Sequence, residues 1–294
     1  MVRLLLLVGL LVGGCSAATA APASSATPAV VVTPAATGTP TWSQSLAPVS
    51  GPTPTSMLLP TSAPSPTPSL APFAITNTLP LPACRYDLDV PTPYLAPASW
   101  RLTLVDALYA VPADYVPADL VSTSAAGLGG FRIRAEALPD LKSLTAAARG
   151  SGIALGLVST YRDYDEQEVL FRSWSARLGT NVYFGSSRPG HSEHQLGLAL
   201  DFTVPGHMPW DYYSFERDTS AGRWLAANAW RYGFVMSYPW KGRDTITCYG
   251  YEPWHYRYVG REEAAALRAS GLTLRQWLWL RQPMSQAPAI GGHL

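Results

Sequence analysis

Apolar residues recur with regular spacing only in the part of the chain that follows residue 84. Between residues 134 and 149 they recur every three or four positions, which predicts a helix that Gly150 and Gly152 bring to an end. Asp163 precedes a second stretch of the same period and is placed to cap a helix that runs to about Leu178. Short apolar runs predict strands at 153–158, 198–204, 234–237 and 255–259, and further segments predict helices at 221–232, 261–269 and 274–280. Because strands and helices interleave without a regular repeat, we expect an α+β fold with a small, mostly antiparallel sheet flanked by helices.

The N-terminal part of the chain has a different composition. No Lys, Arg, Asp or Glu lies between Arg3 and Arg85, and about half of the 27 prolines fall in that stretch. Residues 16–83 are rich in Ala, Pro, Ser and Thr and have too few large apolar side chains to offset the entropy of ordering, so we expect a disordered tether. Residues 84–285 are enough for one domain with a full core, and 286–294 form a short tail.

The first fifteen residues have the features of a targeting segment. Arg3 is followed by an apolar run, 4–12, that is too short to cross a bilayer as a helix, and Cys15 comes shortly after it. This arrangement resembles a bacterial lipobox, in which the cysteine is lipidated and becomes the new N-terminus. Cleavage of a plain secretory signal near Ala18 or Ala20 is the alternative. Both interpretations predict an extracytoplasmic protein, and the lipobox predicts a lipid anchor at Cys15 that holds it to a bacterial membrane.

Two further cysteines, Cys84 and Cys248, would then lie in a compartment where disulfides persist. We expect a bridge between them at one edge of the domain, with two free thiols as the alternative. The formal net charge of +1 argues against a partner held mainly by electrostatic attraction, such as nucleic acid. We expect the protein to be a monomer.

Two short segments carry the residue types of a metal-dependent hydrolase. The first, 192–201, contains His194 and Asp201, and the second, 252–255, contains Glu252 and His255. Two imidazoles and a carboxylate can bind a zinc ion that keeps one position open for water. A second carboxylate can then accept a proton from that water. A single histidine is more often a hydrogen-bonded core or surface residue than a ligand, so it is the grouping that favours a metal site.

The spacing within each segment places a condition on the backbone. In a straight strand the seven positions from His194 to Asp201 would hold the two side chains too far apart for one ion. We therefore expect His194 on a loop, a bend or bulge at Gly197, and Asp201 inside the strand that follows. Pro253 disfavours a helical Glu252 and favours a tight turn over 252–255, which would bring the base and the ligand together.

The chain resembles the VanY-type D-alanyl-D-alanine carboxypeptidases, which share a zinc-peptidase fold with Hedgehog signalling domains and lysostaphin-like enzymes. The resemblance covers about 104–280, nearly the whole domain. The matching residues are Val111-Pro112-Ala113-Asp114-Tyr115-Val116-Pro117, Ser159-Thr160-Tyr161-Arg162 with Gln167, Ser192-Glu193-His194 through Asp201, Trp224-Leu225, Tyr232-Gly233-Phe234, and Glu252-Pro253-Trp254-His255-Tyr256-Arg257-Tyr258-Val259-Gly260.

The resemblance implies a zinc enzyme that removes the C-terminal D-amino acid, most often D-alanine, from peptidoglycan stem peptides. By this resemblance His194, Asp201 and His255 are the zinc ligands, and Glu252 is the general base. An L,D-carboxypeptidase and a cross-bridge endopeptidase of the same fold are the nearest alternatives. A non-catalytic wall-binding module and a cysteine hydrolase built on Cys248 are more distant ones.

The resemblance also assigns roles beside the metal. Arg162 is expected to stabilise the oxygen of the scissile carbonyl as it gains charge, with a structural salt bridge as the alternative. Ser192 is expected to hydrogen-bond the terminal carboxylate of the substrate, and Gln167 to line the same pocket or to face solvent. Glu193 is expected to support the site, and His191 to remain outside the ligand set.

Two positions depart from the family pattern. Cys248 replaces a residue that is usually small, and Ser237 stands before Tyr238-Pro239, where family members often carry Arg. Neither position is a ligand or the base, so these departures concern substrate preference more than activity.

Overall fold

The computed structural model describes residues 77–92, 100–205, 214–241 and 245–282. The predicted leader with Cys15, the tether as far as residue 76, and the tail lie outside the described residues. Residues 77–83, which we assigned to the tether, lie against the last helix, since the Leu280 carbonyl accepts from the Asn77 backbone N–H and Trp279 Nε1 donates to the Leu79 carbonyl. Among the described residues, no helix combines the length and the apolar character that a membrane crossing requires.

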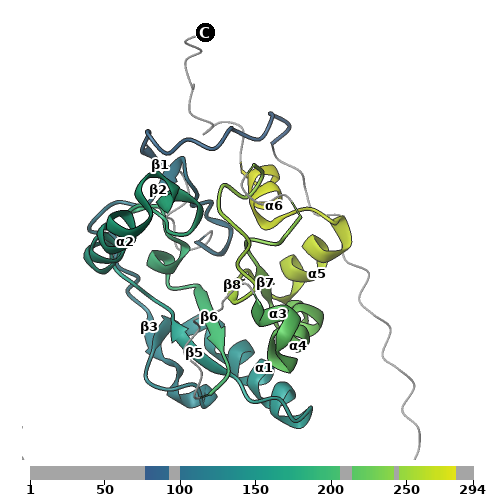
Figure 1. Cartoon of the computed structure of the whole chain (residues 1–294). Coiled ribbons are helices and arrows are strands. Elements are labelled where there is room, and N and C mark those ends of the chain that lie inside the picture. Colours follow the sequence, from purple (N-terminus) through teal and green to yellow (C-terminus); the bar gives the residue numbers. More distant parts are fainter. Residues whose placement is uncertain (1–76, 93–99, 206–213, 242–244, 283–294) are drawn as a thin grey trace, which may run out of the picture. The chain divides into compact units, whose positions relative to one another are not determined.

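A four-stranded antiparallel sheet forms the centre of the domain (Figure 1). Its strands are β5 (Gly156–Ser159), β6 (Ala199–Thr203), β7 (Phe234–Met236) and β8 (His255–Tyr258), in the order β5-β6-β8-β7. Two small strand pairs lie outside this sheet and were not predicted. They are the parallel pair β1 (Val90–Pro91) and β2 (Tyr109–Ala110) and the antiparallel pair β3 (Leu120–Ser122) and β4 (Arg132–Arg134).

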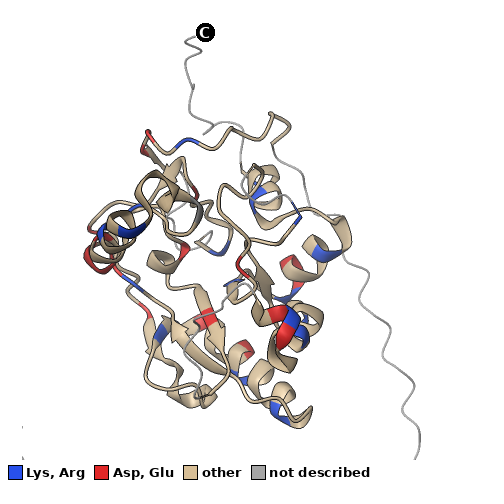
Figure 2. Cartoon of the chain, in the orientation of Figure 1, with Lys and Arg blue, Asp and Glu red and all other residues tan. Residues whose placement is uncertain are grey.

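Helices flank the sheet, with α2 on one side in Figure 1 and α3 to α6 on the other. The α-helices are α1 (Leu138–Gly150), α2 (Tyr164–Leu178), α3 (Phe215–Asp218), α4 (Ser220–Asn228), α5 (Arg261–Ser270) and α6 (Leu274–Leu280). Short 3-10 segments are η1 (Trp100–Leu102), η2 (Thr123–Ala126), η3 (Ala135–Ala137), η4 (Gly179–Phe184), η5 (Glu193–Leu196) and η7 (Ala229–Tyr232). The structure confirms the predicted α+β class, and charged residues of both signs are distributed over the helices (Figure 2).

The two faces of the sheet have different contents because successive side chains on a strand point to opposite sides. On β8, Tyr256 and Tyr258 join the larger apolar cluster together with Phe202 and Phe234. The intervening His255 points to the other face, where polar and charged side chains are buried. One face of the sheet is therefore packed with apolar side chains, and the other carries buried polar side chains that could form an active site.

Candidate active site

Three side chains that could hold a metal converge on the polar face of the sheet. One ligand atom from each of His194, Asp201 and His255 lies within 4.8 Å of the others. Asp201 and His255 are direct partners on adjacent strands, and Asp201 presents one carboxylate oxygen to each histidine, at 3.2 Å from His194 Nε2 and 3.0 Å from His255 Nδ1. The two distances from Asp201 to the imidazole nitrogens, 3.2 and 3.0 Å, are near the spacing of ligand atoms around a tetrahedral ion with bonds of ~2.0–2.2 Å.

The predicted bend between His194 and Asp201 occurs at Gly197. This residue has a φ of 69°, in the left-handed region, and an added Cβ would lie 2.9 Å from Leu120 Cδ2. Glycine satisfies both conditions because it has no Cβ. His194 does not lie on an irregular loop segment, however, although we expected it on a loop. It lies in the 3-10 turn η5, which Gly197 ends and which Ser192 caps by accepting from the His194 backbone N–H.

The hydrogen bond of His194 decides which of its nitrogens is available. Its Nδ1 lies 2.6 Å from the Thr160 carbonyl oxygen, which can only accept, so Nδ1 carries the proton. Nε2 is thereby left with its lone pair toward Asp201. A metal-binding histidine typically donates its other N–H in this way, which fixes the ring orientation.

His255 is oriented by a carboxylate instead. Its Nε2 lies 3.0 Å from Glu193 Oε2, and the same oxygen accepts from Ser237 Oγ at 2.6 Å. Arg257 donates to the other oxygen of Glu193 at 3.1 Å. Burial opposes ionisation of Glu193, but Arg257 and His255 outweigh it and lower its pKa. The ionised Glu193 therefore accepts the Nε2 proton of His255 and leaves Nδ1 for a metal.

Asp201 and His255 form a tightly coupled pair in the protein without metal. Burial alone would raise the pKa of Asp201, but His194 and His255 have the larger, opposite effect, so the net pKa of Asp201 is lowered. Burial disfavours the protonated form of His255, but Asp201 and Glu193 raise its pKa to about 10. A metal that binds here must therefore displace a proton from Nδ1 of His255.

Glu252 approaches the same space from the turn that Pro253 favours. The Glu252 carbonyl accepts from the His255 backbone N–H at 3.1 Å, which closes the predicted turn, and Trp254 packs into the apolar core. The Glu252 carboxylate lies 3.8 Å from His255 Nδ1. Burial, aided by the charge of Asp201, raises the pKa of Glu252 to about 8. A carboxylate with such a pKa beside a metal-bound water is suited to accept a proton.

Comparison with known proteins identifies the family to which this chain belongs. Residues 130–261 match the family model VanY: D-alanyl-D-alanine carboxypeptidase. A solved structure of the LdcB LD-carboxypeptidase is 37% identical, has a TM-score of 0.52, and is matched over 59% of this chain and 83% of that chain. The chain belongs to the VanY family.

Two further relatives support this placement. The putative carboxypeptidase YodJ of Bacillus subtilis (strain 168) is 37% identical over 182 residues, which are 60% of this chain and 66% of YodJ. The vancomycin resistance D,D-pentapeptidase VanY of the VanB-type cassette, solved in complex with Zn(II), is 33% identical, with a TM-score of 0.52. That match covers 61% of this chain and 99% of the solved chain.

The residues that the VanY resemblance placed beside the metal differ in their surroundings. Arg162 lies two residues before α2, and its guanidinium donates to Gln167 Oε1 at 2.6 Å and to Ser159 Oγ at 2.9 Å. Gln167 does not face solvent, because it is 1% exposed and also donates to the Ser187 carbonyl at 2.7 Å. The structure thus brings Gln167 to Arg162 and fixes the orientation of the guanidinium.

The sequence did not predict which residues would surround the Glu193 carboxylate in this VanY-type site. Glu193, Ser237 and Arg257 are far apart in the sequence and meet only in the folded chain. The available signal was an acidic residue inside a segment that folds into the core, since a buried carboxylate requires partners. Ser237, a departure from the family pattern, is one of those partners.

His191 and the two cysteines lie outside the ligand set. His191 makes hydrogen bonds to the Asp106 carbonyl and the Asp89 carboxylate, at 2.7 and 2.8 Å. Cys84 and Cys248 form a disulfide with a Cα–Cα distance of 5.3 Å. Because Cys248 is bridged, it is not a free thiol that could serve as a nucleophile.

Proposed function

We propose that this protein is a zinc-dependent D-alanyl-D-alanine carboxypeptidase that removes the C-terminal D-amino acid from peptidoglycan stem peptides. The observation that carries the proposal is the convergence of three ligand atoms within 4.8 Å of one another, with the Glu252 carboxylate 3.8 Å from His255 Nδ1. The names of the relatives, which include D-alanyl-D-alanine carboxypeptidases of two enterococci, support the reaction class.

His194 Nε2, His255 Nδ1 and an oxygen of Asp201 are the proposed ligands. Zinc, when bound, acidifies the attacking water and polarises the scissile carbonyl. Glu252 accepts the proton of the attacking water and transfers it to the leaving amine. The raised pKa of Glu252 suits both halves of this transfer, because the carboxyl group holds the proton long enough to return it.

Arg162 and Ser192 are the proposed substrate contacts. The Arg162 guanidinium, held by Gln167 and Ser159, would donate to the carbonyl oxygen as negative charge develops there. Ser192 accepts from the His194 backbone N–H and would use its own hydroxyl proton to bind the terminal carboxylate of the substrate. Gln167 acts through Arg162, so we revise its proposed role from lining the pocket to positioning the guanidinium.

We further propose that the catalytic domain is exported and held to a bacterial membrane by lipid on Cys15. The Cys84–Cys248 bridge supports export, because disulfides persist in oxidising compartments. The tether would give a monomeric catalytic domain the reach to meet stem peptides above the membrane.

L,D-carboxypeptidase activity is the second candidate. The solved LdcB structure is as similar in sequence to this chain as YodJ is, and LdcB is named an LD-carboxypeptidase. The two activities differ in the length of stem peptide and in the chirality on the amino side of the cleaved bond.

Defined muropeptides test both candidates. Purified protein with zinc is incubated with tri-, tetra- and pentapeptide muropeptides, and the products are weighed by mass spectrometry. We expect the pentapeptide to lose one D-alanine, with no loss from any substrate in the Glu252→Gln variant or after chelation. Loss from the tetrapeptide alone would replace the proposed activity with the L,D-carboxypeptidase, and internal cleavage would replace it with an endopeptidase.

A further inference from the structure

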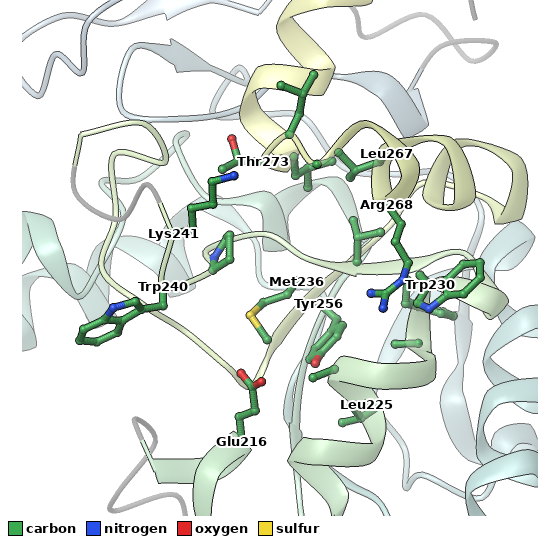
Figure 3. Close-up of a pocket in the computed structure, with 18 of the residues that line it drawn as sticks. Glu216, Leu225, Trp230, Met236, Trp240, Lys241, Tyr256, Leu267, Arg268 and Thr273 are labelled. Carbon is green, nitrogen blue, oxygen red and sulfur yellow. The ribbon is translucent and has the colours of Figure 1, made fainter. Parts of the chain in front are cut away.

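A cavity of about 460 Å³ lies off the free edge of the central sheet (Figure 3). β7 is the last strand in the order β5-β6-β8-β7, so among the described strands nothing pairs with its outer side. The residues that line the cavity come from both faces of the sheet, with Met236 and Tyr256 from one face and Val235 and Leu267 from the other. The cavity therefore lies beside the edge of the sheet, between α4 and the turn that joins α5 to α6.

The register of β7 determines which backbone groups face this cavity. The Gly233 carbonyl accepts from the Val259 N–H, and the Ser237 N–H donates to the His255 carbonyl. The backbone N–H and C=O groups of the odd-numbered residues of this strand therefore point toward β8. In an antiparallel strand the backbone groups of the residues in between point the other way. The N–H and C=O groups of Phe234 and Met236 thus point outward and have no hydrogen-bond partner among the described residues. Unpaired backbone groups at a largely buried edge are uncommon and favour an added strand.

The charges around the cavity favour an acidic occupant. Lys241 and Arg268 line it, and neither makes an ion pair with any described residue. Arg268 lies over the Trp230 ring, 5.2 Å from the centroid. Glu216, the acidic residue among those that line the cavity, accepts a hydrogen bond from the Tyr251 hydroxyl at 2.5 Å. Figure 3 shows Lys241 and Arg268 on opposite sides of the hollow, with Met236 between them.

We propose that an extended L-peptide segment of a partner protein, with an acidic residue next to an apolar one, binds along β7 as a fifth strand. Its backbone pairs with the outward groups of Phe234 and Met236, its apolar side chain fills the cavity between Lys241 and Arg268, and its carboxylate pairs with one of these two cations. A second copy of this chain fits less well, because edge-to-edge pairing would place the same cations, Lys241 and Arg268, opposite one another. This binding surface is separate from the metal site and does not depend on the proposed hydrolysis.

A peptide selection identifies the probe for the test. A phage-displayed library of random L-dodecapeptides is selected on the full chain, and the strongest binder is synthesised and measured by fluorescence anisotropy. We expect an acidic–apolar sequence whose affinity falls about tenfold or more in the Lys241→Ala, Arg268→Ala double variant. Lys142→Ala, which removes an exposed lysine on α1, is the matched control and should leave the affinity unchanged.

The hydrogen-bond pattern of the bound peptide provides the second readout. N-methyl groups placed on every second residue of the synthetic peptide block its strand pairing in one register and spare it in the other. We expect one methylated series to lose binding and the other to retain it. Equal loss in both series, insensitivity to the double variant, or a selection that yields no binder would overturn the proposal. Displacement of the peptide by oligomers of N-acetylglucosamine would also overturn it and assign the cavity to glycan.

Discussion

The two segments that meet at the proposed metal position are built differently. In the first, His194 is oriented by a neutral backbone carbonyl, that of Thr160. In the second, His255 is oriented by the Glu193 carboxylate, which is itself held by Ser237 and Arg257. The second segment also carries the Glu252 carboxylate. In the proposed mechanism the first segment supplies two ligands and the Ser192 contact to substrate, whereas the second combines one ligand with the group that transfers the proton, and its histidine depends on a buried network of charges.

Replacing a ligand and replacing the base should distinguish metal binding from proton transfer most clearly. We expect Glu252→Gln to lower kcat by ~10²–10⁴-fold while zinc stays bound, because the amide cannot accept a proton. His194→Ala should remove zinc and activity together. Zinc content and kcat measured on the same preparations distinguish the two outcomes. Wild-type turnover in Glu252→Gln would show that another group is the base.

The charge network behind His255 can be broken without touching a ligand. Glu193→Gln removes the carboxylate that accepts from His255, so we expect zinc affinity to fall by ~10–100-fold. It also leaves Arg257 buried without its ion-pair partner, and the free energy of unfolding should fall by ~3–5 kcal/mol. Zinc titration and denaturant unfolding measure the two effects.

Ser237→Ala is the matched control for the network. It removes one hydrogen bond to the same Glu193 oxygen but keeps the charge, so its effect on both quantities should be smaller. If Glu193→Gln bound zinc as tightly as the wild type, His255 would be oriented by packing alone and the contrast with His194 would disappear.

The pH dependence of the metal-free protein should reveal the cost of burying Glu252. Its pKa is raised from 4.5 to about 8, so the folded state keeps a proton that the unfolded state releases in this interval. This contribution to stability is present below pH 4.5 and is lost as the pH rises toward 8. We therefore expect metal-free Glu252→Gln to be more stable than the wild type above pH 8, by up to ~5 kcal/mol, with the difference vanishing near pH 4. A constant difference across this range in thermal or denaturant unfolding would contradict the raised pKa.

The smallest expected effect concerns Arg162. Gln167→Ala removes the side chain that accepts from the guanidinium, and we expect kcat to fall about tenfold with zinc affinity unchanged. Gln167→Glu keeps an acceptor at the same place and should restore part of the loss. A reduced zinc affinity in Gln167→Ala would instead indicate a structural role that extends to His194.

Local signals in the sequence predicted much of this site. Gly197 marked the bend, Pro253 marked the turn, and Asp163 marked the start of α2, because each imposes a conformation on its own neighbourhood. The element that carries His194 was predicted as a loop and is a 3-10 turn, because a four-residue turn is too short to give a periodic pattern.

Contacts between distant parts of the chain were beyond such signals. Glu193 contacts residues 44 and 64 positions away, and nothing in the local pattern selects those partners. The pairs β1–β2 and β3–β4 were missed for a related reason, because strands of two or three residues have no measurable alternation. The sequence was thus informative about conformation along the chain and silent about which buried charges would meet.

The disulfide between Cys84 and Cys248 determines in which compartment the domain can acquire its covalent cross-link. It joins positions 164 residues apart, and Cys248 lies just before the turn that presents Glu252. Cytosolic thiols are kept reduced, so a chain still inside the cell would have both cysteines free. For a protein exported as we propose, covalent closure of the domain coincides with arrival in the compartment where stem peptides are assembled into the wall. The last step of maturation would then be an oxidation, and the cell would obtain the finished enzyme only on the far side of its own membrane.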